Sequence, residues 1–164
     1  MNETLITNGV TIAIALLAGL IALHQVKLNV MASARVKWID DLREILSLYS
    51  SELENCSKLK LDFIDELNNP NGKSDEVINE KFYQPYANSA KEVLKLQSKA
   101  FLYLSTKKPD HKELMELLRI NSILVHEKHA SHREAIQKNI QKIISLAQSL
   151  FEIEMRKAKR LFKI

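Results

Sequence analysis

The chain has 164 residues, of which 46% are hydrophobic and 27% are charged, and its formal net charge is +4 at pH 7. It contains only 3 glycines and 3 prolines, whereas the two residues together make up roughly 12% of ordinary proteins. Folds with many turns, such as β-sandwiches, and glycine-dependent phosphate loops are therefore excluded, and an all-α fold is predicted. The single cysteine, Cys56, forms no intrachain disulfide and fits a reducing compartment.

An apolar segment occupies the start of the chain. No Asp, Glu, Lys or Arg occurs among the 23 residues between Glu3 and Lys27, and about 20 such residues span the hydrocarbon core of a bilayer. We therefore expect a single transmembrane helix over residues 1–31. A cleavable signal peptide is the alternative, because Ala32-Ser-Ala34 has the form of a cleavage site. The lack of a basic segment before the apolar run favours an uncleaved anchor.

Basic residues set the expected orientation of this anchor. Lys27, Arg35 and Lys37 follow the apolar segment, whereas only Glu3 precedes it. The positive-inside rule then puts the N-terminus outside and the C-terminal part in the cytoplasm.

One side of the apolar segment carries small and polar residues. Steps of three and four residues give a stripe of Thr4, Asn8, Thr11, Ala15, Ala18, Ala22 and Gln25. Such a stripe meets other helices or water, which predicts a homo-oligomer. Close packing of helices through the small residues is one interpretation. The other is a pore with Asn8 and Thr11 at one mouth, Gln25 at the other and the alanines as a constriction.

The remaining residues, 32–164, are predicted to form a cytoplasmic antiparallel helical bundle. Apolar residues at spacings of three and four predict a helix over 32–67, and no Gly or Pro separates it from the transmembrane helix. A turn at Pro70 precedes a second helix over 75–106, which we expect to be interrupted near Pro85.

The last 55 residues contain neither Gly nor Pro. One apolar stripe keeps its phase through this region, which predicts a single long helix over 110–162. The capping pattern Ser131-His-Arg-Glu134 leaves a separate fourth helix as the alternative. A single helix would exceed its antiparallel partner in length, so we expect its distal half to pair with other copies through residues 136–162.

The C-terminus is strongly basic. Five positive charges fall within the last nine residues: Arg156, Lys157, Lys159, Arg160 and Lys163. We expect them to bind an anionic ligand. With a single long helix they lie far from the membrane, and several copies form a ring that attracts an oligonucleotide. With a fourth helix they return to the bilayer and bind anionic headgroups.

No residue pattern predicts catalysis, a cofactor or a metal. The chain has no nucleophile elbow, phosphate loop or activated cysteine, so we do not expect an enzyme. His126, His129 and His132 are spaced by three residues, but no Cys or His elsewhere completes a zinc site. We interpret them as interface histidines, with a pH-sensitive contact or a metal as alternatives.

The stretch Arg35-Val-Lys-Trp38-Ile39-Asp-Asp-Leu42-Arg43 resembles a family of small bacterial membrane proteins with an R-x-x-W-I-x-x-L-R helix after an N-terminal anchor. The resemblance covers about residues 5–50. It implies a cytoplasmic helical domain on an anchor in the bacterial inner (plasma) membrane. The residue types predict an interfacial or half-buried place for Trp38, and Arg35 and Arg43 can reach either headgroups or the nearby Asp40 and Glu44. Some members look like anti-phage effectors, and the chain is similar in outline to Hailong-type effector channels, whose cytoplasmic part binds an oligonucleotide that controls gating.

These patterns lead to two hypotheses for the function. The first is a single-pass membrane effector in anti-phage defence, whose homo-oligomeric pore or ion channel is gated by the cytoplasmic helical domain, with an oligonucleotide as ligand. The alternative is a membrane-tethered scaffold without a pore, which binds a partner protein through its long helix.

Overall fold

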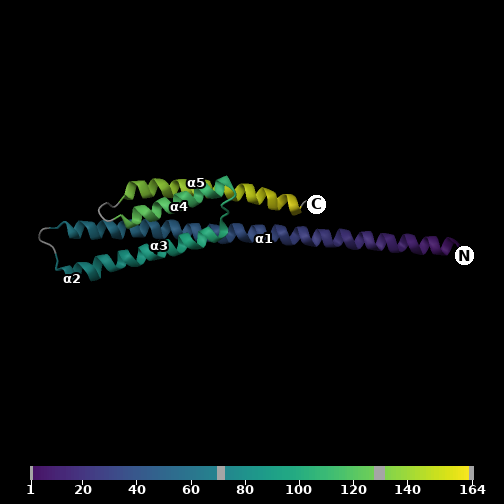
Figure 1. Cartoon of the computed structure of the whole chain (residues 1–164), viewed down its shortest axis with the longest axis horizontal. Helices are drawn as coiled ribbons and strands as arrows, with labels where there is room; N and C mark the ends of the chain where they lie inside the picture. The colour runs from purple at the N-terminus through teal and green to yellow at the C-terminus, as the bar shows by residue number, and fades with distance from the viewer. Residues whose placement is uncertain (1, 70–72, 128–131, 163–164) are drawn as a thin grey trace. The chain divides into compact units, whose positions relative to one another are not determined.

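The computed structural model describes residues 2–69, 73–127 and 132–162. Its elements are α1 (Asn2–Leu67), α2 (Asp75–Ile78), the π-helical turn η1 (Asn79–Tyr83), α3 (Gln84–Tyr103), α4 (Pro109–His126) and α5 (Arg133–Phe162) (Figure 1). These residues include no strand. The all-α prediction is confirmed.

Helix α1 continues without a break from the apolar segment to Leu67, as the sequence predicts. The most apolar 18-residue window in Ile14–Leu67 has a mean hydropathy of 1.6, and none of it is buried. By length and composition this segment can cross a membrane. It differs from the core helix of a soluble protein because its apolar side chains are exposed around the whole helix.

The chain divides into two compact units. The anchor unit contains residues 1–39 and 152–164, and the bundle unit contains residues 40–151. The sequence suggests a division after residue 31 instead. The observed boundary lies after residue 39, and the C-terminal end of α5 belongs to the same unit as the first part of α1.

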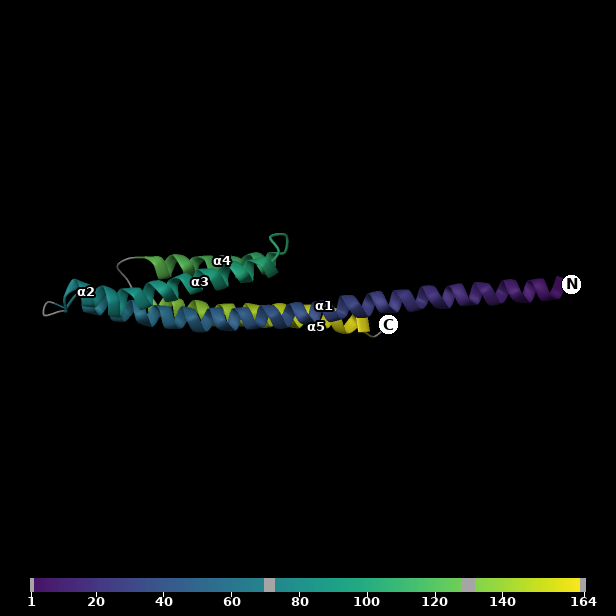
Figure 2. The same cartoon turned by 90° about the horizontal axis from the view of Figure 1, so that it is seen from below.

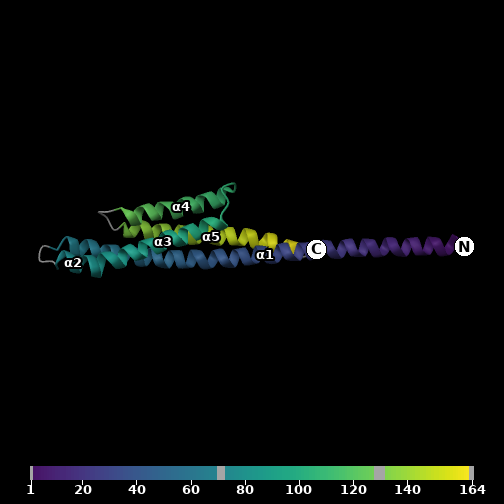
Figure 3. The same cartoon turned by 60° about the horizontal axis from the view of Figure 1, so that its bottom comes forward.

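The bundle unit is an antiparallel four-helix arrangement. The second part of α1, α3, α4 and the first part of α5 lie side by side, and each runs opposite to the one before it in the chain (Figures 1, 2 and 3). Short connections between successive helices favour this up-and-down order. The predicted antiparallel bundle is confirmed.

Apolar stripes on the four helices form the core of the bundle unit. Each buries residues that recur at spacings of three and four. The buried side chains include Leu42, Leu46, Tyr49, Leu53 and Cys56 of α1, Val93, Leu96 and Ala100 of α3, Leu114, Leu118 and Val125 of α4, and Ile136, Ile143, Ala147 and Leu150 of α5. Leu67, the last residue of α1, is 56% exposed.

The single helix predicted over residues 110–162 is wrong. Helix α4 ends at His126 and α5 begins at Arg133, so the separate fourth helix is the observed arrangement. Glu127 is extended, with φ −68° and ψ 124°, and His132 has a left-handed φ of 47°. Reversal at this point lets the α5 stripe pack within the same chain instead of requiring a second copy.

The predicted interruption near Pro85 takes the form of the π-helical turn η1. Pro85, at the start of α3, follows this turn directly and has no backbone N–H to donate to it. The Ser89 hydroxyl is buried and donates a hydrogen bond to Glu52 of α1.

Buried polar side chains fix how the helices pair. The Tyr49 hydroxyl donates to the Leu118 carbonyl oxygen (3.0 Å), and the Ser122 hydroxyl donates to Gln97 Oε1 (2.7 Å). Burial raises the pKa of the Tyr49 phenol, which therefore stays a neutral donor. Because each bond joins two helices at one level, a shift in register would leave a buried polar group unpaired.

Two leucine truncations test this core. We expect Leu53→Ala to lower the free energy of unfolding by about 2–5 kcal/mol, because the fully buried side chain leaves a cavity. Leu102→Ala removes the same atoms from a side chain that is 84% exposed, and we expect a change within about 0.5 kcal/mol. Thermal unfolding of the full chain in mild detergent, followed by circular dichroism, measures both. Equal losses in the two variants would contradict the observed packing.

Candidate membrane-interface site

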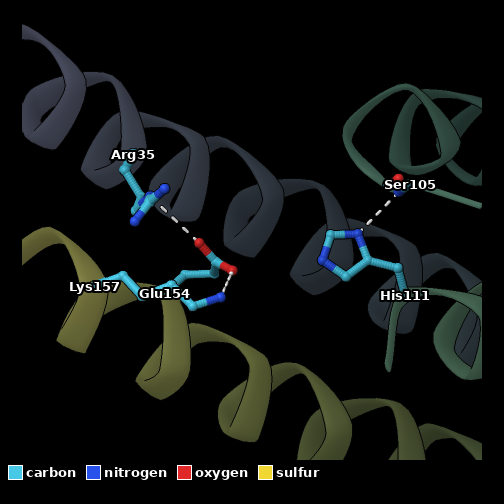
Figure 4. Close-up of polar contacts among 5 residues, drawn as sticks. All are labelled: Arg35, Ser105, His111, Glu154 and Lys157. Atoms are coloured by element: carbon cyan, nitrogen blue, oxygen red, sulfur yellow. Dashed lines mark hydrogen bonds and ion pairs between the residues drawn. The ribbon is translucent and has the colours of Figure 1, made fainter. Parts of the chain in front are cut away.

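The anchor unit brings the end of α5 next to the part of α1 that follows the apolar segment. Arg35 Nε lies 3.4 Å from Glu154 Oε2, and Lys157 Nζ donates to Glu154 Oε1 at 2.7 Å (Figure 4). The Glu154 side chain is only 6% exposed. A carboxylate this deeply buried needs cationic partners, and it has one on each helix.

Small residues allow this close approach. Ala32 of α1 is fully buried and Ala158 of α5 is 1% exposed. Glu154 and Ala158 are four residues apart and therefore lie on the same side of α5. Buried alanines on both helices thus accompany the buried ion pair between Arg35 and Glu154, and this ion pair fixes one register between the helices.

Antiparallel packing sets the height of the basic residues along α1. The end of α5 runs toward the apolar segment of α1 (Figures 1 and 2). Both helices rise about 1.5 Å per residue, so Lys159 and Arg160 lie roughly level with residues 29–30 of α1. Val30 is 62% exposed there. The basic end of α5 therefore lies at the boundary where the exposed apolar surface of α1 stops.

We name these exposed or half-buried cations the basic collar. It consists of Lys27, Arg35 and Lys37 of α1 and Arg156, Lys157, Lys159 and Arg160 of α5. Four of the five predicted ligand residues are thus brought together, with three cations of α1 in the same unit. Lys163 lies outside the described residues.

The predicted small and polar stripe is exposed where its side chains are described. Ala15, Ala18, Ala22 and Gln25 have no covering residue in the described part of the chain. Gly19 likewise faces open space, since a Cβ built there meets nothing within 4 Å. The side chains of Asn8 and Thr11 lie outside the described residues.

The other two juxtamembrane residues lie in different surroundings from Arg35. Trp38 is half-buried in the anchor unit. Arg43 belongs to the bundle unit, where its guanidinium donates to Asp40 Oδ1 at 3.0 Å and lies 5.3 Å from the centre of the Phe151 ring. Arg43 therefore packs on the bundle as well as contacting a neighbouring carboxylate.

The histidine series does not converge on a site. His126 Nδ1 lies 2.7 Å from the Ser122 carbonyl oxygen, and His132 Nε2 lies 2.6 Å from Glu127 Oε2. His129 lies outside the described residues. Among the residues that the structure describes, no group of three His, Cys, Asp or Glu side chains is placed to hold a metal ion.

Glu154 is the residue of this site that the sequence reasoning missed. It follows Leu150 and precedes Ala158 at the four-residue spacing of the buried stripe. An acid in phase with a core stripe indicates a cationic partner on another helix, and this signal was present. His111 was also missed: it is buried in α4, and its Nδ1 accepts a bond from the Ser105 backbone N–H at 2.9 Å, which closes the connection from α3 (Figure 4).

Comparisons with protein families, curated proteins and solved structures give no match to this chain.

Removing the Arg35 cation tests the geometry of the site. We expect Arg35→Met to free the end of α5 from α1, because burial of Glu154 with one fewer partner costs about 1–3 kcal/mol. Trypsin should then cleave after residues 156–160 about tenfold faster or more, since cleavage follows the open population. The matched control is Arg119→Met, which removes a pair with exposed Glu116. Unchanged cleavage in Arg35→Met would count against the ion pair.

Proposed function

We propose that this protein is a single-pass membrane effector whose basic collar binds anionic lipid headgroups beside the anchor helix. The apolar part of α1 spans the bilayer, and the helical bundle lies on the cytoplasmic side. The observation that carries this proposal is the position of the α5 end. Four exposed cations of α5 lie at the boundary where the exposed apolar surface of α1 stops.

The break between α4 and α5 favours lipid headgroups over an oligonucleotide as the ligand of these cations. A ring of basic ends far from the membrane requires one continuous helix over 110–162. Because α5 is a separate helix that folds back along α1, that requirement is not met. Lipid headgroups offer phosphate at the level of the collar, and each Lys or Arg near an anionic surface contributes about 1 kcal/mol.

The composition of the collar supports this choice of ligand. Among the side chains that the structure describes in this unit, seven cations stand against two acids, the buried Glu154 and the exposed Glu152. The Glu152 carboxylate lies 3.4 Å from Arg156 across one helical turn, and both side chains are more than two-thirds exposed. Such exposed pairs are weak, so Arg156 remains available to a phosphate. The three basic residues that follow the apolar segment also favour a cytoplasmic bundle.

A fluorescent label on α5 tests headgroup binding. The full chain carries Leu161→Cys labelled with a polarity-sensitive dye and is placed in nanodiscs; Cys56 is fully buried and does not compete for the label. We expect stronger dye emission with phosphatidylglycerol than with phosphatidylcholine. The difference in emission between the two lipids should decrease as salt is added. It should vanish in the triple variant Arg156→Gln, Lys159→Gln, Arg160→Gln, because each cation contributes about 1 kcal/mol to binding of the anionic surface.

The matched control removes three charges elsewhere. Lys91→Gln, Lys95→Gln and Lys99→Gln lie on the exposed side of α3 in the bundle unit. This variant should keep the full response to phosphatidylglycerol. An equal loss in both triple variants would mean that net charge, not the collar, causes the response.

A homo-oligomeric pore gated by the helical domain is the second candidate function. The specific observation is the exposed stripe of Ala15, Ala18, Ala22 and Gln25, which the described chain leaves uncovered within an apolar segment. Small residues let helices of several copies approach closely, and a polar glutamine favours water or a helix partner over lipid. The resemblance of the Arg35 to Arg43 stretch to anti-phage membrane effectors supports the same candidate.

Bulky substitution separates packing from conduction. We expect Ala18→Trp to abolish ion flux through liposomes while crosslinked oligomers persist, if the stripe lines a lumen. Leu20→Trp is the control, because Leu20 follows Ala18 by two residues, about 200° around the helix, and therefore lies on the opposite side of α1. Loss of oligomers together with flux in Ala18→Trp would indicate packing alone. Undiminished flux would reject the lumen.

A further inference from the structure

The bundle unit contains a cavity of about 580 Å³ between α1, α3 and the end of α4. Three aromatic rings line it, Phe63, Tyr83 and Tyr86, together with three basic side chains, Lys60, Lys91 and His126. Among the residues that the structure describes, no acidic side chain lines it. Its volume lies within the roughly 300–1,000 Å³ that small-molecule sites occupy.

The aromatic wall is a defined arrangement. The rings of Phe63 and Tyr86 are nearly parallel, at 11° and 6.0 Å between centres, and Tyr83 is tilted by 52° against Phe63 at 5.4 Å. Tyr83 is the last residue of the π-helical turn η1, a type of turn that occurs frequently at functional sites. It is 41% exposed, so part of its ring is open to a ligand.

Two of the lining residues are held in place by the end of α4. Lys60 Nζ donates to the Leu124 carbonyl oxygen at 2.8 Å, and the Tyr86 hydroxyl donates to the Val125 carbonyl oxygen at 2.6 Å. These carbonyls belong to the last turn of α4 and have no helical partner. The bonds therefore preorganise one cation and one ring of the cavity.

The positive charge of Lys60 is partly compensated by the Glu127 carboxylate, which lies beyond ion-pair distance. Lys60 is only 2% exposed, and no carboxylate of the described residues lies within ion-pair distance of it. Burial lowers its pKa, which is the expected cost of a desolvated ammonium. His126 uses Nδ1 toward Ser122 and keeps Nε2 for another partner, and the exposed Lys91 also lines the cavity. An anion in the cavity would meet all three groups.

We propose that this cavity binds a small molecule that carries a flat aromatic ring and a carboxylate or phosphate group. The ring stacks on the wall formed by Phe63, Tyr83 and Tyr86. The anionic group lies against Lys60, Lys91 and His126. This ligand site belongs to the helical domain and is separate from headgroup binding at the collar.

Three probes test the two halves of this recognition. The full chain in phosphatidylcholine nanodiscs is titrated with 2-naphthoate, with the neutral 2-naphthamide and with the non-aromatic cyclohexanecarboxylate, and binding is measured by saturation-transfer NMR against empty nanodiscs. We expect 2-naphthoate to bind with a Kd below about 1 mM and each of the other two about tenfold more weakly. No binding of 2-naphthoate, or equal binding of the neutral amide, overturns the proposal.

Two variants with a matched control locate the bound probe. Tyr83→Ala and Lys91→Gln change exposed side chains of the lining, and each should weaken 2-naphthoate by about fivefold to tenfold. Lys95→Gln removes a charge one turn away on α3, outside the lining, and should leave the Kd unchanged. Retained thermal midpoints show that the variants fold. A Kd unchanged in both lining variants, or equally weakened in the control, contradicts this site.

Discussion

The buried stripe of α1 is the constraint on which the rest of the bundle unit depends. From Leu42 to Lys60 it covers about 28 Å at 1.5 Å per residue. Helix α4 has 18 residues and α3 has 20, so each spans about the same length. A single helix over the last 55 residues would cover this stripe once and leave most of its own apolar residues in water. Because the chain reverses after α4, both α4 and α5 pack on the buried stripe of α1. The reversal therefore comes near the end of that stripe.

Much of the fold follows from the spacing of apolar residues, and the exceptions have physical causes. The continuity of α1 and the antiparallel bundle were predictable because no breaker interrupts the periodicity before Pro70. The reversal between His126 and Arg133 carries no Gly or Pro, and His132 adopts its left-handed backbone without either. Tertiary packing outweighed local propensity there. The cavity was not predictable, because Phe63, Tyr83 and His126 come from three separate segments.

Two ionisable residues in phase with core stripes explain how the helices find their register. Glu154 interrupts the α5 stripe and reaches Arg35, and Lys60 extends the α1 stripe and reaches the end of α4. Each is nearly inaccessible to water, so displacing its partner leaves a desolvated charge. Apolar stripes alone tolerate sliding by one turn, whereas these charges do not. The proposed headgroup surface includes the contact of Glu154 with Arg35, and the proposed ligand cavity includes the contact of Lys60 with the end of α4.

The burial of Cys56 changes what the single cysteine says about the protein. The thiol is inaccessible in the core of the bundle unit, and burial raises its pKa to about 11. At pH 7 only about one molecule in ten thousand carries the reactive thiolate, even before access is considered. A lone cysteine in this position is protected in oxidising surroundings as well as in reducing ones. Its chemistry therefore reports on the opening of the four helices and carries no information about the compartment.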